Sequence, residues 1–143
     1  SVLWKTEYLK LFPFPKQENV NFVSESVVWH PLSMKYPVLC INEFIGIIEY
    51  QSSGLSDSSY KKAFLKGIAF TNFYLLKNNI HSWKKYPKIR WQEYVQLIIN
   101  SKLTDASYFS QLKLLDKIVY IVAYPRSYYS YLNMRKHVEK TEK

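Results

Sequence analysis

The side chains that most often perform catalysis are sparse and scattered in this sequence. The three histidines, His30, His81 and His137, lie far apart, and no pair has the i, i+4 spacing of a helical metal site. Cys40 is the only cysteine, so the chain can form neither an internal disulfide nor a cluster of thiolate metal ligands. A cysteine nucleophile needs a neighbouring base. The sequence identifies none for Cys40, which favours a buried structural thiol.

Phosphate-binding loops and catalytic carboxylate pairs are also missing. The chain contains three glycines: Gly46, Gly54 and Gly67. They match neither the phosphate-binding loop of nucleotide hydrolases nor the dinucleotide-binding fingerprint. Two carboxylate pairs lie close in sequence, outside any motif for acid–base catalysis: Glu43 with Glu49, and Glu139 with Glu142. We therefore predict a non-enzymatic chain without metal or cofactor, and a pocket that joined His30, Cys40 or His81 to a carboxylate would argue against this.

Positive charge is the most informative feature of the composition. The 143 residues carry a formal net charge of +9, from 20 Lys and Arg against 11 Asp and Glu. Residues 1–50 hold four basic and five acidic residues, whereas residues 51–143 hold the other sixteen basic and six acidic ones. No acid occurs between Asp57 and Glu93. This asymmetry indicates an anionic partner for the second part of the chain.

Cations and aromatic residues alternate through the acid-free stretch, which predicts a binding surface. Cations neutralise phosphates and release counterions, and exposed aromatic rings stack on unpaired bases. The predicted contact residues are Lys61, Lys62, Lys66, Lys77, Trp83, Lys84, Lys85, Tyr86, Lys88 and Arg90, with Arg126, Arg135 and Lys136 as a second cluster. In the alternative interpretation, the lysines form solvated helix faces, and Trp83 and Tyr86 pin their link to the fold.

Two classes of function fit this surface. The first is a non-catalytic module that contacts DNA or RNA, although the sequence contains no zinc-finger spacing, RNP sequence or GXXG loop. The second is a helical adaptor that docks an acidic protein segment, because the Tyr and Arg of residues 124–131 are types enriched at binding hot spots. In both hypotheses the chain is a domain excised from a larger protein that assembles with other subunits.

The expected setting is intracellular, nuclear rather than cytoplasmic. A single cysteine suits a reducing compartment. No run reaches the roughly 18–20 uncharged apolar residues of a membrane span, so none is predicted. A membrane-surface helix is disfavoured because the strongly apolar residues are expected to pack in the core.

Helices are predicted to position these residues. Apolar residues recur at helical spacing over residues 2–12, 42–51, 58–79, 89–101, 105–124 and 127–138. Residues 16–37, rich in Val and Pro, predict a short β-hairpin or an extended segment laid over the helices. The sequence therefore predicts one mainly α domain, residues 1–143. The whole chain is predicted to form a compact bundle of five to six helices. A first helix and an extended cover (residues 1–40) precede the basic helical bundle (residues 41–140).

Three details of the helices can be tested against a structure. Gly67, inside the longest predicted helix, indicates a close helix crossing or a kink. Pro125 is predicted to separate the last two helices, because proline cannot donate to the helical ladder. The residues predicted to face the core from these two helices are Tyr108, Leu112, Leu115, Val119, Val122, Tyr128, Tyr131, Leu132 and Val138.

Overall fold

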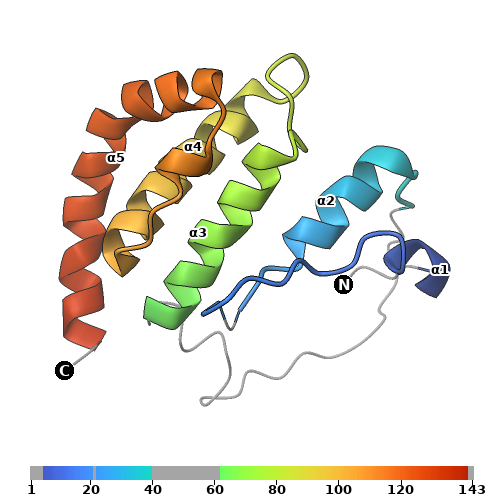
Figure 1. The fold of residues 1–143 in the computed structure, drawn as a ribbon, viewed down its shortest axis with the longest axis horizontal. Helices are drawn as coiled ribbons and strands as arrows, with labels where there is room; N and C mark the ends of the chain where they lie inside the picture. Colours follow the sequence, from blue (N-terminus) through green and yellow to red (C-terminus); the bar gives the residue numbers. More distant parts are fainter. Residues whose placement is uncertain (1–4, 21, 40–61, 142–143) are drawn as a thin grey trace.

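The computed structural model describes residues 5–20, 22–39 and 62–141, and these residues are mainly helical. Their α-helices are α1 (Thr6–Leu9), α2 (Ser26–Lys35), α3 (Lys62–Lys77), α4 (Pro87–Thr104) and α5 (Leu114–Thr141), and a 3-10 helix, η2, spans Phe109–Gln111. Neighbours in sequence are neighbours in space, so the helices form a row in which α4 lies between α3 and α5 (Figure 1). The prediction of a mainly α chain is confirmed.

The main core lies between α3 and α4. It contains Ala69, Phe70, Phe73, Leu76, Tyr94, Leu97, Ile98, Tyr108, Leu112 and Ala123. The residues from α3 and α4 recur every three or four positions, which is the spacing of a buried helix face. A smaller cluster joins Leu65 of α3, Ile99 and Leu103 of α4, and Val138 of α5. Full burial of one such aliphatic side chain contributes about 1.5–3 kcal/mol.

Residues 26–35 form helix α2, so the predicted β-hairpin is wrong for the described residues. The buried residues Val27, Val28 and Leu32 lie on one side of α2 and pack against Tyr8 and Phe12. β-Branched valines favour strands, but strand preference depends on the packing that the fold offers. Here the spacing from Val27 and Val28 to Leu32, four or five residues, is the one that a helix needs to bury all three.

Part of the predicted extended cover is present, and it crosses α3 at Gly67. A Cβ on Gly67 would collide with the backbone carbonyl and the ring of Phe22. The Phe22 ring stacks on Phe64 with centroids 4.5 Å apart, and the Ser24 amide donates to Thr71 Oγ1 at 3.1 Å. Gly67 does mark a close approach, but its partner is the non-helical N-terminal chain, so the predicted helix crossing is wrong.

Helix α5 is one helix of 28 residues where the sequence predicted two. It begins at Leu114, because Asp105 ends α4 with a left-handed backbone (φ 54°) instead of starting a new helix. Pro125 lies inside α5 and does not stop it. Its ring is exposed, so the carbonyl of Ile121 that loses its donor can be hydrated. Figure 1 shows α5 changing direction along its length, and an internal proline is a usual cause of such a bend.

Some predictions lie outside the described residues. These are the helix over residues 42–51, the first turn of the helix over residues 58–79, and the positions of Cys40 and Lys61. No described helix combines the length and hydropathy that a bilayer crossing requires.

Candidate interaction surfaces

The predicted basic surface is divided between the two ends of α3. Lys62 and Lys66 lie in the first turns of this helix, whereas Lys77 is its last residue. At about 1.5 Å per residue, Lys62 and Lys77 are separated by about 22 Å of helix. Lys62 and Lys66 therefore cannot join the cations of the link between α3 and α4 in one small contact site.

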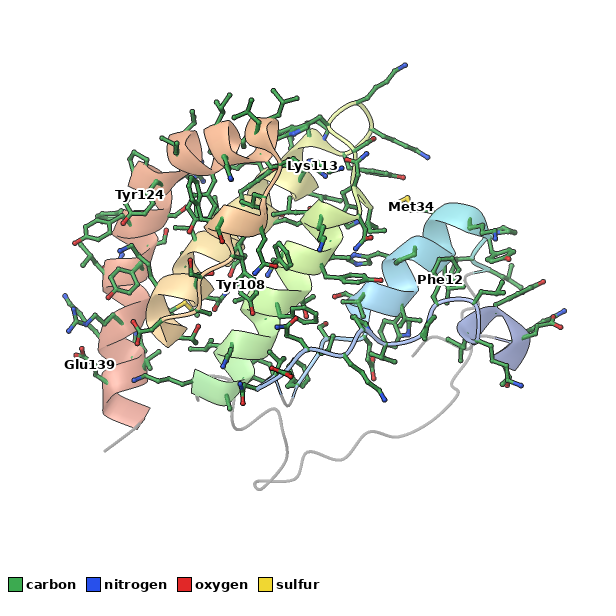
Figure 2. All side chains as sticks on the ribbon, in the orientation of Figure 1. Phe12, Met34, Tyr108, Lys113, Tyr124 and Glu139 are labelled. Carbon is green, nitrogen blue, oxygen red and sulfur yellow. The ribbon has the colours of Figure 1, made fainter. Side chains whose placement is uncertain are left out.

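The basic residues that do lie together surround the link of residues 78–86. Lys77 precedes the link, Lys84 and Lys85 lie in it, and Lys88 is in the first turn of α4; all four are exposed. No acid occurs from residue 78 to residue 92. Lys113, labelled in Figure 2, also lies at this end, because the start of α5 contacts the start of α4. The four lysines Lys77, Lys84, Lys85 and Lys88 are called the link lysines below.

Arg90 is not part of that exposed group, which corrects the sequence-based prediction. Its guanidinium is buried, with Nη2 donating to Asp116 Oδ1 at 3.0 Å and Nη1 donating to the His81 carbonyl at 3.1 Å. The Tyr94 hydroxyl donates to the same oxygen of Asp116. Arg90 therefore ties α4 to α5 and to the link. The sequence carried no signal for this pair, since its members are 26 residues apart.

A second buried polar group lies beneath the link. His81 Nδ1 is 2.5 Å from Glu93 Oε1, and the rings of His81 and His30 are in edge contact at 4.7 Å between centroids. Burial raises the pKa of Glu93 to about 8, and burial lowers the pKa of both histidines below 6.5. Near neutral pH, we therefore describe the pair as a protonated Glu93 that donates to a neutral His81.

This cluster has the composition of a catalytic site, but its buried pair is closed to a substrate. It joins two histidines to a carboxylate, the arrangement that would argue for an enzyme. His81 and Glu93 are only 2% and 5% exposed, however. Within the part of the chain that the structure describes, no group of three or more His, Cys, Asp or Glu side chains could hold a metal ion. The absence of catalysis remains a prediction.

The aromatic residues of the link pack into the fold, which supports the alternative interpretation of the sequence. Trp83 stacks on Tyr94 with centroids 6.0 Å apart and planes at 14°, and it stays 40% exposed. Tyr86 meets His81 edge-on at 5.7 Å. Trp83 thus fixes the link to α4, the Tyr86 contact lies within the link, and only part of Trp83 is left for stacking on a ligand.

The second predicted cluster lies on α5. Arg126, Arg135 and Lys136 are all exposed, and Arg135 Nε donates to Glu139 Oε1 at 2.6 Å. Because these residues belong to the last helix of the row, they are separate from the link lysines.

The largest group of exposed apolar side chains also lies on α5, and the sequence analysis missed it. Leu114 and Leu115 are each 76% exposed, Val122 is 63% exposed and Tyr129 is 71% exposed. The whole set, called the outer face of α5, is Leu114, Leu115, Ile118, Ile121, Val122, Tyr124, Tyr128, Tyr129 and Leu132. Leu115, Val122, Tyr128 and Leu132 were predicted to face the core, and that prediction is wrong.

The face of α5 that packs on α4 consists of small and polar residues. Asp116, Ala123 and Ser127 are buried there, and the Ser127 hydroxyl donates to the Ala123 carbonyl at 2.8 Å. Small side chains let the two helix backbones approach closely, and Asp116 must face Arg90. Together these demands set the rotation of α5, and they turn its largest aliphatic residues outward.

A shallow hollow of about 280 Å³ lies near the C-terminal end of α5. It is lined by Lys62, Lys102, Leu103, Asp105, Tyr131, Arg135, Val138 and Glu139. The lining carries both positive and negative charges, so the hollow has no clear preference for a ligand of either sign.

We compared the chain with protein-family models, curated proteins and solved structures. No protein-family model, curated protein or solved structure matches the chain. The functional argument therefore depends on the surfaces described above.

Proposed function

We propose that this chain is a non-catalytic helical interaction module that docks a protein partner on the outer face of α5. The observation that carries the proposal is the exposure of nine large apolar side chains on one helix. Soluble monomers rarely expose contiguous apolar patches larger than a few hundred Å², and larger patches mark interaction sites. Burial of one exposed Leu, Ile or Val side chain contributes about 1.5–3 kcal/mol, so a partner that covers several of them gains affinity.

The chemistry of this face fits a protein better than a nucleic acid. The aliphatic residues Leu114, Leu115 and Ile118 have no aromatic ring to stack on bases and no charge for phosphates. Tyr128, Tyr129 and Arg126, farther along α5, are residue types enriched at hot spots of protein interfaces. Both the aliphatic and the aromatic parts of the face can therefore serve one protein partner. We propose, as the sequence led us to expect, that this partner is a subunit of a larger assembly inside the cell, in the nucleus rather than the cytoplasm.

Site-specific photo-crosslinking tests this function. A photoreactive amino acid replaces Ile118 or Tyr129 in the chain expressed in its own cells, and Leu11, an exposed apolar residue near α1, serves as the matched control. We expect one discrete crosslinked protein from the two α5 positions and none from Leu11. That protein, once purified, should bind the chain at least about tenfold more weakly when Ile118 is changed to Glu, a loss of about 1.4 kcal/mol. Equal affinity for both chains would refute the proposal.

A second function, contact with DNA or RNA, is favoured by the link lysines. Four exposed cations without a neighbouring acid can meet about four phosphates, which predicts a slope of log affinity against log salt of about −3 to −4. Changing Lys84 and Lys85 to Glu should reduce affinity for short single- and double-stranded oligonucleotides and flatten that slope. Fluorescence anisotropy measures both, and Lys62→Glu at the far end of α3 is the control. Unchanged affinity in the double variant would exclude this surface.

A further inference from the structure

We propose that the partner on the outer face of α5 is an amphipathic helix whose apolar stripe is bordered by acidic residues. This inference rests on the proposed function and specifies its partner. It combines two independent features of α5: the spacing of the exposed apolar residues and the sign of the charges beside them.

The spacing of the exposed residues is the one by which one helix packs on another. Leu115, Ile118 and Val122 are separated by three and four residues, and Tyr129 and Leu132 continue the same heptad positions after Pro125. A stripe with this spacing accepts the side chains of a partner helix between its own residues. Leu114 and Ile121 widen the stripe beside this line. The first arm of α5, residues 114–124, therefore offers about 16 Å of apolar surface, or three helical turns.

Both edges of this stripe carry cations. Lys117 follows Leu114 by three residues and precedes Ile121 by four, so it borders one edge. Arg126 follows Val122 by four residues and borders the other edge. The α5 sequence contains only two acids, and both have partners on the chain itself: Asp116 pairs with Arg90, and Glu139 pairs with Arg135. Among the described residues, the border of the stripe therefore carries positive charge at Lys117 and Arg126, and the Lys117 ammonium also lies over the Phe109 ring at 5.7 Å from its centroid.

The positive charges beside the stripe favour an acidic partner helix over a second copy of α5. In a symmetric pair of α5 helices, Lys117 and Arg126 of each copy would border an equally basic stripe, and like charges at such positions oppose pairing. A helix with Glu or Asp beside its apolar stripe would meet these cations with opposite charge. Since α5 changes direction along its length (Figure 1), a straight partner of about three turns fits the first arm best.

Designed peptides test the charge rule directly. Two labelled peptides of roughly 18 residues, long enough for about five turns, share one Leu/Ile stripe; one has Glu beside the stripe and the other has Lys. We expect the Glu peptide to bind the full chain at least about tenfold more tightly, a difference of about 1.4 kcal/mol. Arg126→Glu, alone and combined with Lys117→Glu, should lower or reverse this preference. Lys10→Glu with Lys16→Glu makes the same change of charge beside α1, at the other end of the row of helices, and should retain the preference of the unmodified chain.

Other occupants give different results, and each would overturn the inference. A concentration-dependent dimer in sedimentation that Ile118→Glu abolishes would identify a second copy. Binding to vesicles of phosphatidylcholine and phosphatidylserine that Ile118→Glu abolishes, without binding to either peptide, would identify a lipid surface. Equal affinity for the Glu and Lys peptides would refute the charge rule alone. In that case a crosslinked partner that depends on Ile118 would still support the proposed function, so the two failures are distinguishable.

Discussion

Helices α4 and α5 are neighbours of opposite character. Helix α4 lies inside the row and buries its apolar residues Tyr94, Leu97 and Ile98 completely. Helix α5 lies at the end of the row, buries Asp116, Ala123 and Ser127 against α4, and exposes Leu115 and its other large aliphatic residues. Both helices carry apolar residues at helical spacing. The difference shows that position in the row and one buried ion pair decide which face is covered.

The ion pair between Arg90 of α4 and Asp116 of α5 should give the largest loss of stability when one partner is removed. Arg90 and Asp116 have side chains 4% and 10% exposed, and Arg90→Ala would leave Asp116 buried without its cation. Such a loss costs about 3–5 kcal/mol, a large share of the roughly 5–15 kcal/mol that stabilises a domain. Thermal unfolding followed by circular dichroism should show a much lower midpoint. Arg135→Ala, which breaks the exposed pair with Glu139, should leave the midpoint unchanged.

A double variant of Arg90 and Asp116 separates the cost of an unpaired buried charge from the cost of the other contacts that these two side chains make. Arg90→Leu combined with Asp116→Leu removes both charges and replaces them with apolar volume, which is often neutral or stabilising for buried pairs. We expect this double variant to be much more stable than Arg90→Ala. Because the double variant also leaves the Tyr94 hydroxyl and the His81 carbonyl without these partners, equal instability of the two variants would assign the cost to the unpaired polar groups rather than to the unpaired charge.

Matched leucine truncations in the two helices give the next largest contrast. Leu97 of α4 is fully buried, so Leu97→Ala should reduce the free energy of unfolding by about 2–5 kcal/mol. Leu115 of α5 is 76% exposed, so Leu115→Ala should change it by no more than about 0.5 kcal/mol. Denaturant titration measures both. A loss at Leu115 as large as that at Leu97 would mean that the outer face of α5 is buried in the free protein.

The same pair of helices shows how far the sequence could predict the fold. For α4, the apolar residues lie mainly on one periodic face, and that face is buried at Tyr94, Ile98 and Ile99. For α5, apolar residues occur on both sides, so periodicity alone could not choose between them. The choice depended on Asp116, whose partner Arg90 is distant in sequence and had been assigned to a ligand.

The binding residues show a similar limit. Lysines at helix ends and in a link are exposed whatever the fold, so Lys77, Lys84 and Lys85 were predicted correctly as surface residues. Composition could not show that α3 would hold Lys62 far from them. It also could not show that Trp83 would stack on Tyr94, because ring stacking depends on the path of the link. To predict the binding residues, one would also need to know which helices lie close together, and residue types alone do not give this.

The buried carboxyl of Glu93 in α4 should make the free energy of unfolding depend on pH. The pKa of Glu93 is about 8 in the folded chain against an ordinary value of 4.5, so the unfolded chain binds fewer protons between these values. Its contribution to stability is complete below 4.5 and is lost as pH rises through about 8. At pH 7 the two histidines of the unfolded chain, with an ordinary pKa of 6.5, are still about one quarter protonated, and this offsets part of the loss. From about pH 7 to 8, the free energy of unfolding should therefore fall by less than about 1.4 kcal/mol per pH unit.

Glu93→Gln provides the control for this prediction. The amide can still donate to His81 Nδ1 but cannot ionise, so the variant should lose no stability over that pH range. Denaturant titrations at several pH values compare the two chains. A parallel decline in both would assign the pH dependence to another group.

The smallest expected change in stability concerns Lys102, near the C-terminal end of α4, where that helix packs against α5. The Lys102 ammonium lies over the rings of Tyr124, Tyr128 and Tyr131 at 5.2–5.5 Å from their centroids. At a partly exposed site such contacts contribute about 0.5–1 kcal/mol. Lys102→Met keeps most of the apolar stem and removes the charge, so it should destabilise the chain by about that amount. Lys102→Arg should retain most of the stability. If Lys102→Met is neutral, the ammonium does not help to hold these tyrosine rings against α4.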